Sequence, residues 1–342
     1  MDISISGRFL GPKHPVFIIA EGCDNHLGNM QVARDMVREA KLAGADAIKF
    51  QHHLPDEEML RDAPMSDNFE EPLYDFLKKY ALTLEQHSEL KRYCEEIGII
   101  YMCTPFSWKA AQEIESQVPA FKIGSGEMTD IPTLVRISGF GKPMIVSTGM
   151  STFEEIDRTY QALVKRNIEL ILLNCVSEYP PVYEDLNLGV IGKMIKRFPR
   201  ALIGHSDHTP DLFTSFAAVA LGARVLEKHV ILDKRQPGPD QSVSIEFGEL
   251  ACLVEGVRKI EVGLGTDKLV HSREADIRSW AFRSIVSTRH IAKGETITQE
   301  EIWSKRPGTG IPAYQMDDVI GCRVVRDIKG NTLISWDDLA RD

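Results

Sequence analysis

The sequence predicts an α/β protein, a (β/α)8 TIM barrel followed by a small β-rich domain. Short apolar, β-branched runs recur along the first two thirds of the chain, and each precedes a stretch with helical periodicity. Their nearly continuous apolar character is typical of parallel strands buried on both faces. Successive βα units within about 250 residues favour a closed barrel, with a doubly wound open sheet as the alternative.

Eight apolar runs define the predicted strands. They are VFIIAEG from Val16, ADAIKFQ from Ala45, GIIYMCTPF from Gly98, AFKIGSG from Ala120, PMIVSTG from Pro143, LILLNCVS from Leu170, ALIGHSDHT from Ala201 and ARVLEKHVILD from Ala223. Between them, segments such as MQVARDMVREAKLAG and TLEQHSELKRYCEEIG indicate amphipathic helices that end at glycine. We therefore expect the barrel over residues 1–267.

The character of the chain changes after Asp267. A polar stretch, KLVHSREADIRSW, is followed by the strand-like pieces AFRSIVSTRHI, GETITQEEIW, GCRVVRDI and NTLISWDDL. We expect a linker over residues 268–281, although its charges would also suit an exposed helix end, and a separate β-rich domain over residues 282–342.

Composition narrows the class of protein. With 43% hydrophobic and 26% charged residues, the chain resembles an ordinary globular protein, and no apolar run is long enough to cross a membrane. The N-terminus lacks the features of a secretory signal, so we expect a cytoplasmic location. A net charge of −10 argues against nucleic acid as a partner. The six cysteines form no C-x-x-C pair, which favours reduced thiols over a disulfide framework or a zinc site.

Polar side chains stand at or just beyond the end of every predicted strand, where a barrel of this class builds its active site. They are Glu21, Asn25, His26, Lys49, Gln51, Thr104, Lys122, Ser125, Glu127, Ser147, Thr148, Ser177, Tyr179, Ser206, Asp207, His208, Glu227, Lys228 and His229.

Two of these residues, Lys49 and Lys122, lie inside apolar strands. A buried ammonium is costly unless an anion compensates its charge. One interpretation is a pocket for phosphate and carboxylate groups, with hydroxyl donors from Ser125, Ser147 and Ser206. The other is that the lysines pair with barrel glutamates such as Glu21 and Glu127.

Histidines close two adjacent strands. His208 and His229 are placed to hold a divalent cation while leaving coordination positions open, although two histidines without a third ligand also suit a structural role. His205 should point to the opposite face from Ser206 and is left out of the site. The rigid loop Gln236–Asp240 either aims Asp240 over the barrel mouth or is an ordinary turn.

Together these segments resemble the sialic acid synthase family. The shared motifs, in order along the chain, are A-E-x-x-x-N-H-x-G (Ala20–Gly28), K-F-Q (Lys49–Gln51), K-I-G-S-G-E (Lys122–Glu127), S-T-G-M (Ser147–Met150), Y-P (Tyr179–Pro180), G-H-S-D-H-T (Gly204–Thr209), L-E-K-H (Leu226–His229) and P-G-P-D (Pro237–Asp240). The C-terminal part, with K-R-P-G-T-G from Lys305, resembles the antifreeze-like (SAF) domain of these synthases.

The resemblance implies condensation of phosphoenolpyruvate with an N-acetylated amino sugar, such as N-acetylmannosamine, and water. The products would be a nine-carbon sialic acid-type sugar acid and phosphate. It also implies a site of three parts. Phosphoenolpyruvate would be held by Lys49, Lys122, Ser125, Ser147 and Ser206. The sugar would meet Glu21, Gln51, Tyr179 and Asp240, and Arg306 would reach its N-acetyl group from the partner subunit of a domain-swapped homodimer. Mn²⁺ or Mg²⁺ would be bound by His208 and His229. Glu21, Glu127 and His229 would take part in catalysis.

The first motif departs from the family pattern. Where the family usually has isoleucine and then glycine after the glutamate, this chain has Gly22, Cys23 and Asp24. This change and the loop Pro55–Tyr74 leave the acceptor open, since related enzymes make legionaminic or pseudaminic acid from diacetylated sugars.

Two rival functions remain at this stage. One is a Schiff-base aldolase in which Lys122 is the nucleophile. The other is a barrel without activity whose β-rich domain binds a carbohydrate or an ice-like surface. The polar residues at all eight predicted strand ends argue against the second.

Overall fold

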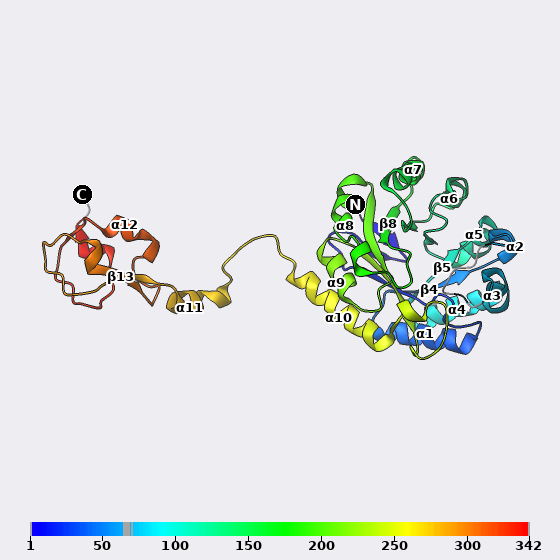
Figure 1. The fold of residues 1–342 in the computed structure, drawn as a ribbon, viewed down its shortest axis with the longest axis horizontal. Coiled ribbons are helices and arrows are strands. Elements are labelled where there is room, and N and C mark those ends of the chain that lie inside the picture. Colours follow the sequence, from blue (N-terminus) through cyan, green and yellow to red (C-terminus); the bar gives the residue numbers. More distant parts are fainter. Residues whose placement is uncertain (1, 64–68, 70, 341–342) are drawn as a thin grey trace. The chain divides into compact units, whose positions relative to one another are not determined.

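The computed structural model describes residues 2–63, 69 and 71–340 (Figure 1). They belong to two compact units, Met1–Gly265 and Thr266–Asp342. Part of the predicted specificity loop Pro55–Tyr74, namely residues 64–68 and 70, lies outside the described residues.

The first unit contains a parallel sheet that is nearly closed into a barrel. Its strands are β3 (Phe17–Glu21), β4 (Ala47–His52), β5 (Ile100–Pro105), β6 (Phe121–Ile123), β7 (Met144–Ser147), β8 (Leu170–Cys175), β9 (Ala201–Asp207) and β10 (Val225–Ile231). Their order is β5-β4-β3-β10-β9-β8-β7-β6, and β11 (Ile245–Glu246) adds to β10. The end strands β5 and β6 pack side by side. Each predicted strand is therefore present, and the barrel is confirmed over the open sheet.

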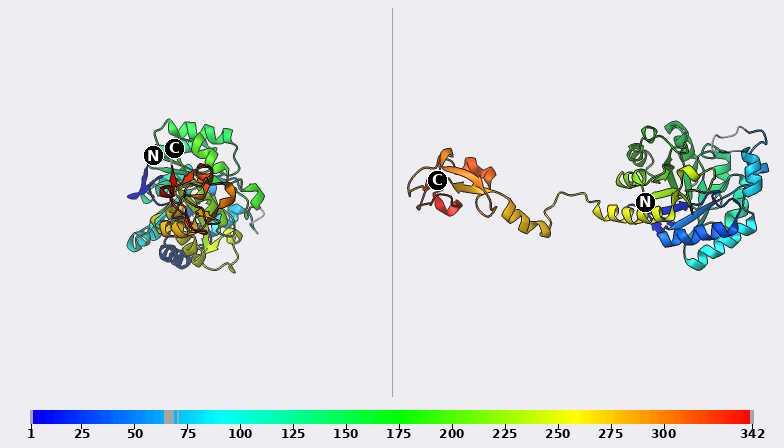
Figure 2. Two further views of the ribbon diagram at one scale, coloured as in Figure 1. Left: turned by 90° about the vertical axis from the view of Figure 1, so that its left-hand side faces the viewer. Right: turned by 60° about the horizontal axis from the view of Figure 1, so that its bottom comes forward.

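Helices cover the outer side of these strands, as Figures 1 and 2 show. They are α1 (Met30–Ala43), α2 (Pro55–Glu58), α3 (Leu73–Tyr80), α4 (Leu84–Ile97), α5 (Trp108–Ile114), α6 (Ile131–Ser138), α7 (Phe153–Val164), α8 (Val190–Arg197), α9 (Phe213–Ala220) and α10 (Phe247–Gly263). Helix α1 begins at an Asn29 cap and ends at Gly44, whose φ of 87° suits glycine. Helix α4 has a Thr83 capping box and ends at Gly98.

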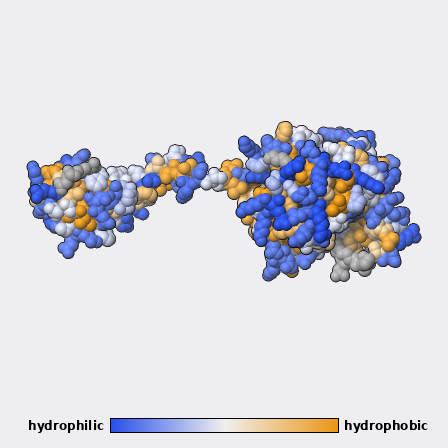
Figure 3. Space-filling view, turned by 90° about the horizontal axis from the view of Figure 1, so that it is seen from above, coloured by the Kyte–Doolittle hydropathy of each residue, from blue (hydrophilic) through white to orange (hydrophobic). Residues whose placement is uncertain are grey.

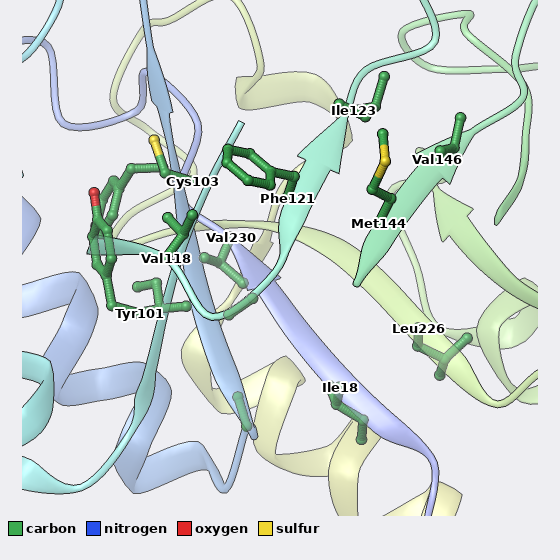
Figure 4. Packing of buried hydrophobic residues seen from close by; sticks show 14 of the residues in the cluster. Ile18, Tyr101, Cys103, Val118, Phe121, Ile123, Met144, Val146, Leu226 and Val230 are labelled. Carbon is green, nitrogen blue, oxygen red and sulfur yellow. The ribbon is translucent and has the colours of Figure 1, made fainter. Parts of the chain in front are cut away.

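Strand side chains alternate between two apolar layers. One layer, which includes Ile18, Phe121 and Leu226, packs against the helices, and Figure 4 shows part of it. The other fills the barrel interior, with Ile145 and Ile171 among its members. Because both faces of each strand are buried, the strands read as nearly continuous apolar runs.

An N-terminal hairpin, which the sequence analysis did not anticipate, joins the interior layer. It consists of β1 (Ile3–Ile5) and β2 (Arg8–Leu10), paired antiparallel. Ile3, Ile5 and Leu10 are fully buried in the same cluster as the inward residues at the start of the barrel strands. The hairpin thus seals the end of the barrel where the strands begin.

The second unit has its own core of ten buried apolar residues, mostly isoleucine and valine. Its elements are α11 (Ser272–Ala281), α12 (Met316–Val319), β12 (Ser284–Ser287), β13 (Ile302–Lys305), β14 (Arg323–Val324) and β15 (Leu339–Ala340), with β12 paired to β13 and β14 to β15. Helix α11 occupies most of the predicted linker, and its Ile277 and Trp280 are exposed. Figure 3 shows hydrophobic residues at the surface of this helical segment. In the described part of the chain, no helix combines the length and apolar character that a bilayer crossing requires.

Candidate active site

A cavity of about 360 Å³ opens at the carboxyl ends of the barrel strands. Its lining contains every residue that the sequence analysis assigned to the site except Arg306. These are Glu21, Lys49, Gln51, Lys122, Ser125, Glu127, Ser147, Tyr179, Ser206, His208, His229 and Asp240. It also contains residues that the assignment left out, among them Cys23, Asp24, His53, Thr104, Cys175, Ser177 and Glu227.

Strand register explains why these side chains meet. On β3, Glu21 stands opposite His229 of β10 on one side and Lys49 of β4 on the other. On β10, Glu227 stands opposite Ser206 of β9. Because side chains alternate along a strand, residues in step across neighbouring strands point to the same interior.

The two lysines pair with glutamates rather than standing free. Lys49 forms an ion pair with Glu21, lies 3.6 Å from Glu227 and donates to Thr104 Oγ1 at 2.9 Å. Lys122 lies 3.3 Å from Glu227 and donates to Ser147 Oγ at 2.9 Å. The pairing interpretation thus holds for Lys49 and Glu21, whereas the acid beside Lys122 is Glu227 and not Glu127.

Glu227 is the shared acid of this cluster and was not assigned to the site. It accepts a hydrogen bond from Ser206 Oγ at 2.9 Å. Burial alone would raise its pKa, but Lys122 and Lys49 outweigh burial and lower the pKa to about 2. Burial lowers the pKa of Lys49 to about 8. Glu227 could have been predicted from the sequence, because it lies two residues before His229 on the same strand and therefore points to the same interior face.

Glu127 stands apart from the lysine pairs. Burial raises its pKa to about 7. Its Oε2 atom is buried and has no hydrogen-bond partner among the described residues. A carboxyl group of this kind can take up and return a proton near neutral pH.

The aromatic side of the cavity contains both predicted metal-binding histidines. The rings of His208 and His229 lie 5.2 Å apart, and Tyr179 stacks 4.3 Å from His208. Nδ1 of His208 lies 2.7 Å from the carbonyl oxygen of Val176, which requires the proton on Nδ1. Nε2, 3.2 Å from the Tyr179 hydroxyl, is then the lone-pair nitrogen that a metal would use.

His229 has a donor set of its own. Ligand atoms of Cys23, His229 and Asp240 lie within 4.8 Å of one another, the one such group among the described residues. Burial, with His208 nearby, holds the pKa of His229 well below its usual value, so the imidazole is neutral. Its Nδ1 atom is buried without a hydrogen-bond partner in the described part of the chain. Neutral imidazole, thiol and carboxylate groups fit a divalent cation.

Other polar residues of the strand ends point away from the cavity. Asp207 and Lys228 form a fully buried pair, 3.2 Å apart, on the opposite phase of β9 and β10. Lys228 and the Thr214 and Ser215 hydroxyls, which donate to Asp207, hold its pKa low despite burial. His205 bonds to the carbonyl oxygen of Asn174 and, as expected, does not line the cavity.

Arg306 belongs to the second unit. It donates to the carbonyl oxygen of Ala281 at 3.0 Å and stacks over the Trp280 ring at 5.3 Å. Its contact with the sugar therefore stays a prediction.

The barrel is closed by apolar side chains at one end, and at the other it has a cavity lined by lysines, acids, hydroxyls and residues able to bind a metal, which is the layout of a barrel enzyme. Within that class, the chain belongs to the NeuB family, which matches residues 36–268, and a SAF domain follows over residues 282–340.

Relatives cover nearly the whole chain. Uncharacterized protein MJ1065 of Methanocaldococcus jannaschii is 39% identical, over 99% of this chain and 99% of that protein. N-acetylneuraminate-9-phosphate synthase of Homo sapiens is 35% identical, over 96% and 94%. Other relatives are named N,N'-diacetyllegionaminic acid synthase and pseudaminic acid synthase.

The fold also matches a solved relative. The N-acetylneuraminic acid (sialic acid) synthetase of Leptospira borgpetersenii serovar Hardjo-bovis, in complex with citrate, has a TM-score of 0.73 and 31% identity. The match covers 81% of this chain and 95% of that one.

Proposed function

We propose that this chain condenses phosphoenolpyruvate with an open-chain N-acetylated amino sugar and water. The products are a nine-carbon sugar acid of the sialic acid type and inorganic phosphate. The observation that carries the proposal is one cavity with two chemically different sides, a lysine and serine side and a histidine, tyrosine and carboxylate side.

The lysine and serine side suits phosphoenolpyruvate. The two ammonium groups are balanced by Glu21 and Glu227 when no ligand is bound. Each lysine nevertheless keeps a neutral partner, Thr104 for Lys49 and Ser147 for Lys122. Phosphate or carboxylate oxygens can replace these hydroxyls without leaving a glutamate unpaired. Ser125 supplies a further donor, whereas the Ser206 hydroxyl donates to Glu227 and holds that acid beside the lysines.

The other side suits a polyhydroxylated acceptor. Gln51, Tyr179 and Asp240 offer donors and acceptors to hydroxyl groups, and His208 and His229 would hold the divalent cation. When bound, the cation polarises the aldehyde oxygen. Gln51, Tyr179 and Asp240 orient the aldehyde toward the methylene carbon of phosphoenolpyruvate.

The reaction forms one carbon–carbon bond and breaks the carbon–oxygen bond to phosphate. The methylene carbon attacks the aldehyde carbon and forms the new carbon–carbon bond, which leaves a cationic centre at the former enol carbon and an alkoxide at the former aldehyde oxygen. The alkoxide takes up the proton that Glu127 receives from water in the next step. Glu127, as carboxylate, stabilises that centre and takes a proton from the water that adds to it. The carbon–oxygen bond to phosphate then breaks as the added hydroxyl becomes the ketone oxygen and passes its proton to the leaving phosphate, which keeps the bridging oxygen.

Oxygen labelling tests this order of steps. With phosphoenolpyruvate labelled at the bridging oxygen, the label should appear in inorganic phosphate, and oxygen from labelled water should appear in the sugar acid. Bridging label retained in the sugar acid, or water label confined to phosphate, would contradict the proposal.

A panel of acceptors identifies the sugar. N-acetylmannosamine, its 6-phosphate, mannose and a diacetylated sugar are each assayed for phosphate release after chelation and metal add-back. We expect turnover with an N-acetylated acceptor and none with mannose. Borohydride with pyruvate should not trap the protein, because Glu227 keeps the Lys122 amine paired; trapping would support the aldolase alternative.

The quaternary part of the proposal rests on the family resemblance. We propose a homodimer in which Arg306 supports binding of the N-acetyl group. Sedimentation should give a dimer, and Arg306→Ala should raise KM for the acceptor while KM for phosphoenolpyruvate stays unchanged.

A further inference from the structure

Cys23 lines the cavity next to His229 and Asp240. It is buried and its φ is 45°, a left-handed conformation that favours glycine. Its side chain lines the cavity, so the thiol is within reach of a ligand bound there.

The surrounding residues fix the thiol in position. The backbone N–H of Cys23 donates to Glu21 Oε1 at 2.9 Å. Its Sγ donates to Asp240 Oδ2 at 2.8 Å and accepts from Gln51 Nε2 at 3.0 Å. The Gln51 amide can keep this hydrogen bond when the sulfur binds a cation.

His229 lies beside Cys23 and Asp240 and offers a third potential ligand for a cation. His229 is buried, lines the cavity, and has an Nδ1 atom without a hydrogen-bond partner in the described residues. The ligand atoms of His229, Cys23 and Asp240 are mutually within 4.8 Å, so small side-chain shifts would bring them onto one ion.

We propose that Cys23 and Asp240 bind the catalytic cation together with His229, giving a thiolate, imidazole and carboxylate site that prefers Zn²⁺ or Co²⁺ over Mg²⁺. This inference rests on the proposed function for the catalytic use of the ion. Thiolate selects thiophilic metals, whereas Mg²⁺ takes oxygen ligands. Together with His208, which the proposed function places on the same ion, these residues make four protein ligands, and a fifth coordination position would be left for the acceptor oxygen.

Metal binding would replace the thiol hydrogen that Cys23 shares with Asp240. The proton leaves to solvent as the sulfur–metal bond forms, so one proton is released for each ion bound. No oxidant or reductant takes part.

Cobalt spectroscopy of the full chain tests the proposal. Chelator-treated protein titrated with Co²⁺ should develop a near-ultraviolet sulfur-to-cobalt charge-transfer band at one ion per chain. Cys23→Ser and Cys23→Gly should lose the band and bind Zn²⁺ at least about 10-fold more weakly. The glycine variant suits the left-handed backbone, so it should fold as well as the parent and controls for misfolding.

Cys175 provides the matched control. It lines the same cavity, with Sγ 3.9 Å from His208 Nδ1, and Cys175→Ser should keep the band. X-ray absorption of the zinc form should show one sulfur at about 2.3 Å. No band in the parent, a band that persists in Cys23→Gly, or a band lost in Cys175→Ser would each overturn the proposal.

These outcomes are separate from those of the proposed function. Turnover with Mg²⁺ but no cobalt–sulfur band would refute the thiolate site and leave the synthase reaction standing. A cobalt–sulfur band without turnover of any acceptor would support the site and contradict the reaction.

Discussion

The barrel interior has two halves of opposite character, built from the same strands. Where the strands begin, Ile145, Ile171 and Val225 pack with the N-terminal hairpin into a sealed apolar layer. Where they end, Lys122 and Glu227 line an open polar cavity. On β10 only one inward position separates Val225 from His229. The same alternation of inward and outward side chains along a strand therefore stabilises the fold at the end where the strands begin and supplies polar groups to the cavity at the end where they finish.

Loss of the shared acid should have the largest effect. Glu227→Gln leaves Lys49 and Lys122 short of a carboxylate, and breaking such a buried pair costs about 3–5 kcal/mol in the free energy of unfolding. Because the lysines also lose their positions, kcat/KM for phosphoenolpyruvate should fall at least about 100-fold. Chemical denaturation and steady-state kinetics measure the two effects.

Asp207→Asn is the matched control, because it breaks the buried pair with Lys228 on the other side of the strands. We expect a comparable loss of stability, with the affinity of the folded protein for phosphoenolpyruvate unchanged. Equal losses of affinity in the two variants would show that the halves are not separate in function.

A core substitution tests the sealed half. Ile171→Ala removes a fully buried side chain from the interior layer, which should lower the free energy of unfolding by about 2–5 kcal/mol. Because Ile171 does not line the cavity, kcat per folded molecule should be retained. A loss of kcat with an unchanged denaturation curve would contradict the division.

The pH profile sharpens the polar half. Above about pH 8, Lys49 loses its proton and with it the positive charge that would bind phosphoenolpyruvate. Below about pH 7, Glu127 gains a proton and can no longer act as a base. The profile of kcat/KM should therefore fall on both sides, by about tenfold per pH unit. Glu127→Gln should remove the acidic limb and Lys49→Arg the alkaline limb, apart from a lower overall rate. An unchanged acidic limb in Glu127→Gln would assign that limb to another group.

The smallest effect is expected at a single hydroxyl. Ser206→Ala removes the hydrogen bond to Glu227, worth about 1 kcal/mol. The dissociation constant for phosphoenolpyruvate, followed by calorimetry, should rise about fivefold. An effect as large as that of Glu227→Gln would mean that the serine, rather than the acid, organises the lysines.

The sequence alone predicted the barrel, because buried parallel strands must be apolar on both faces and separated by amphipathic helices. It also predicted many of the side chains that share the cavity, since the carboxyl ends of parallel strands meet at one end of a barrel. For this reason the sequence predicts Lys49 of β4 and His229 of β10 at the same end of the barrel, and both line the cavity.

Tertiary structure decided the partners within that set. Whether Lys122 pairs with Glu127 or Glu227 depends on the reach of side chains across strands, which periodicity does not encode. The hairpin Ile3–Leu10 is too short to predict from its pattern, and its packing against residues far along the chain is a long-range contact. Cys23 came near Asp240, 217 residues away, only when the barrel closed. The sequence therefore determined the fold and many of the side chains that line the cavity, and the tertiary contacts determined the charge and donor atoms that each group presents.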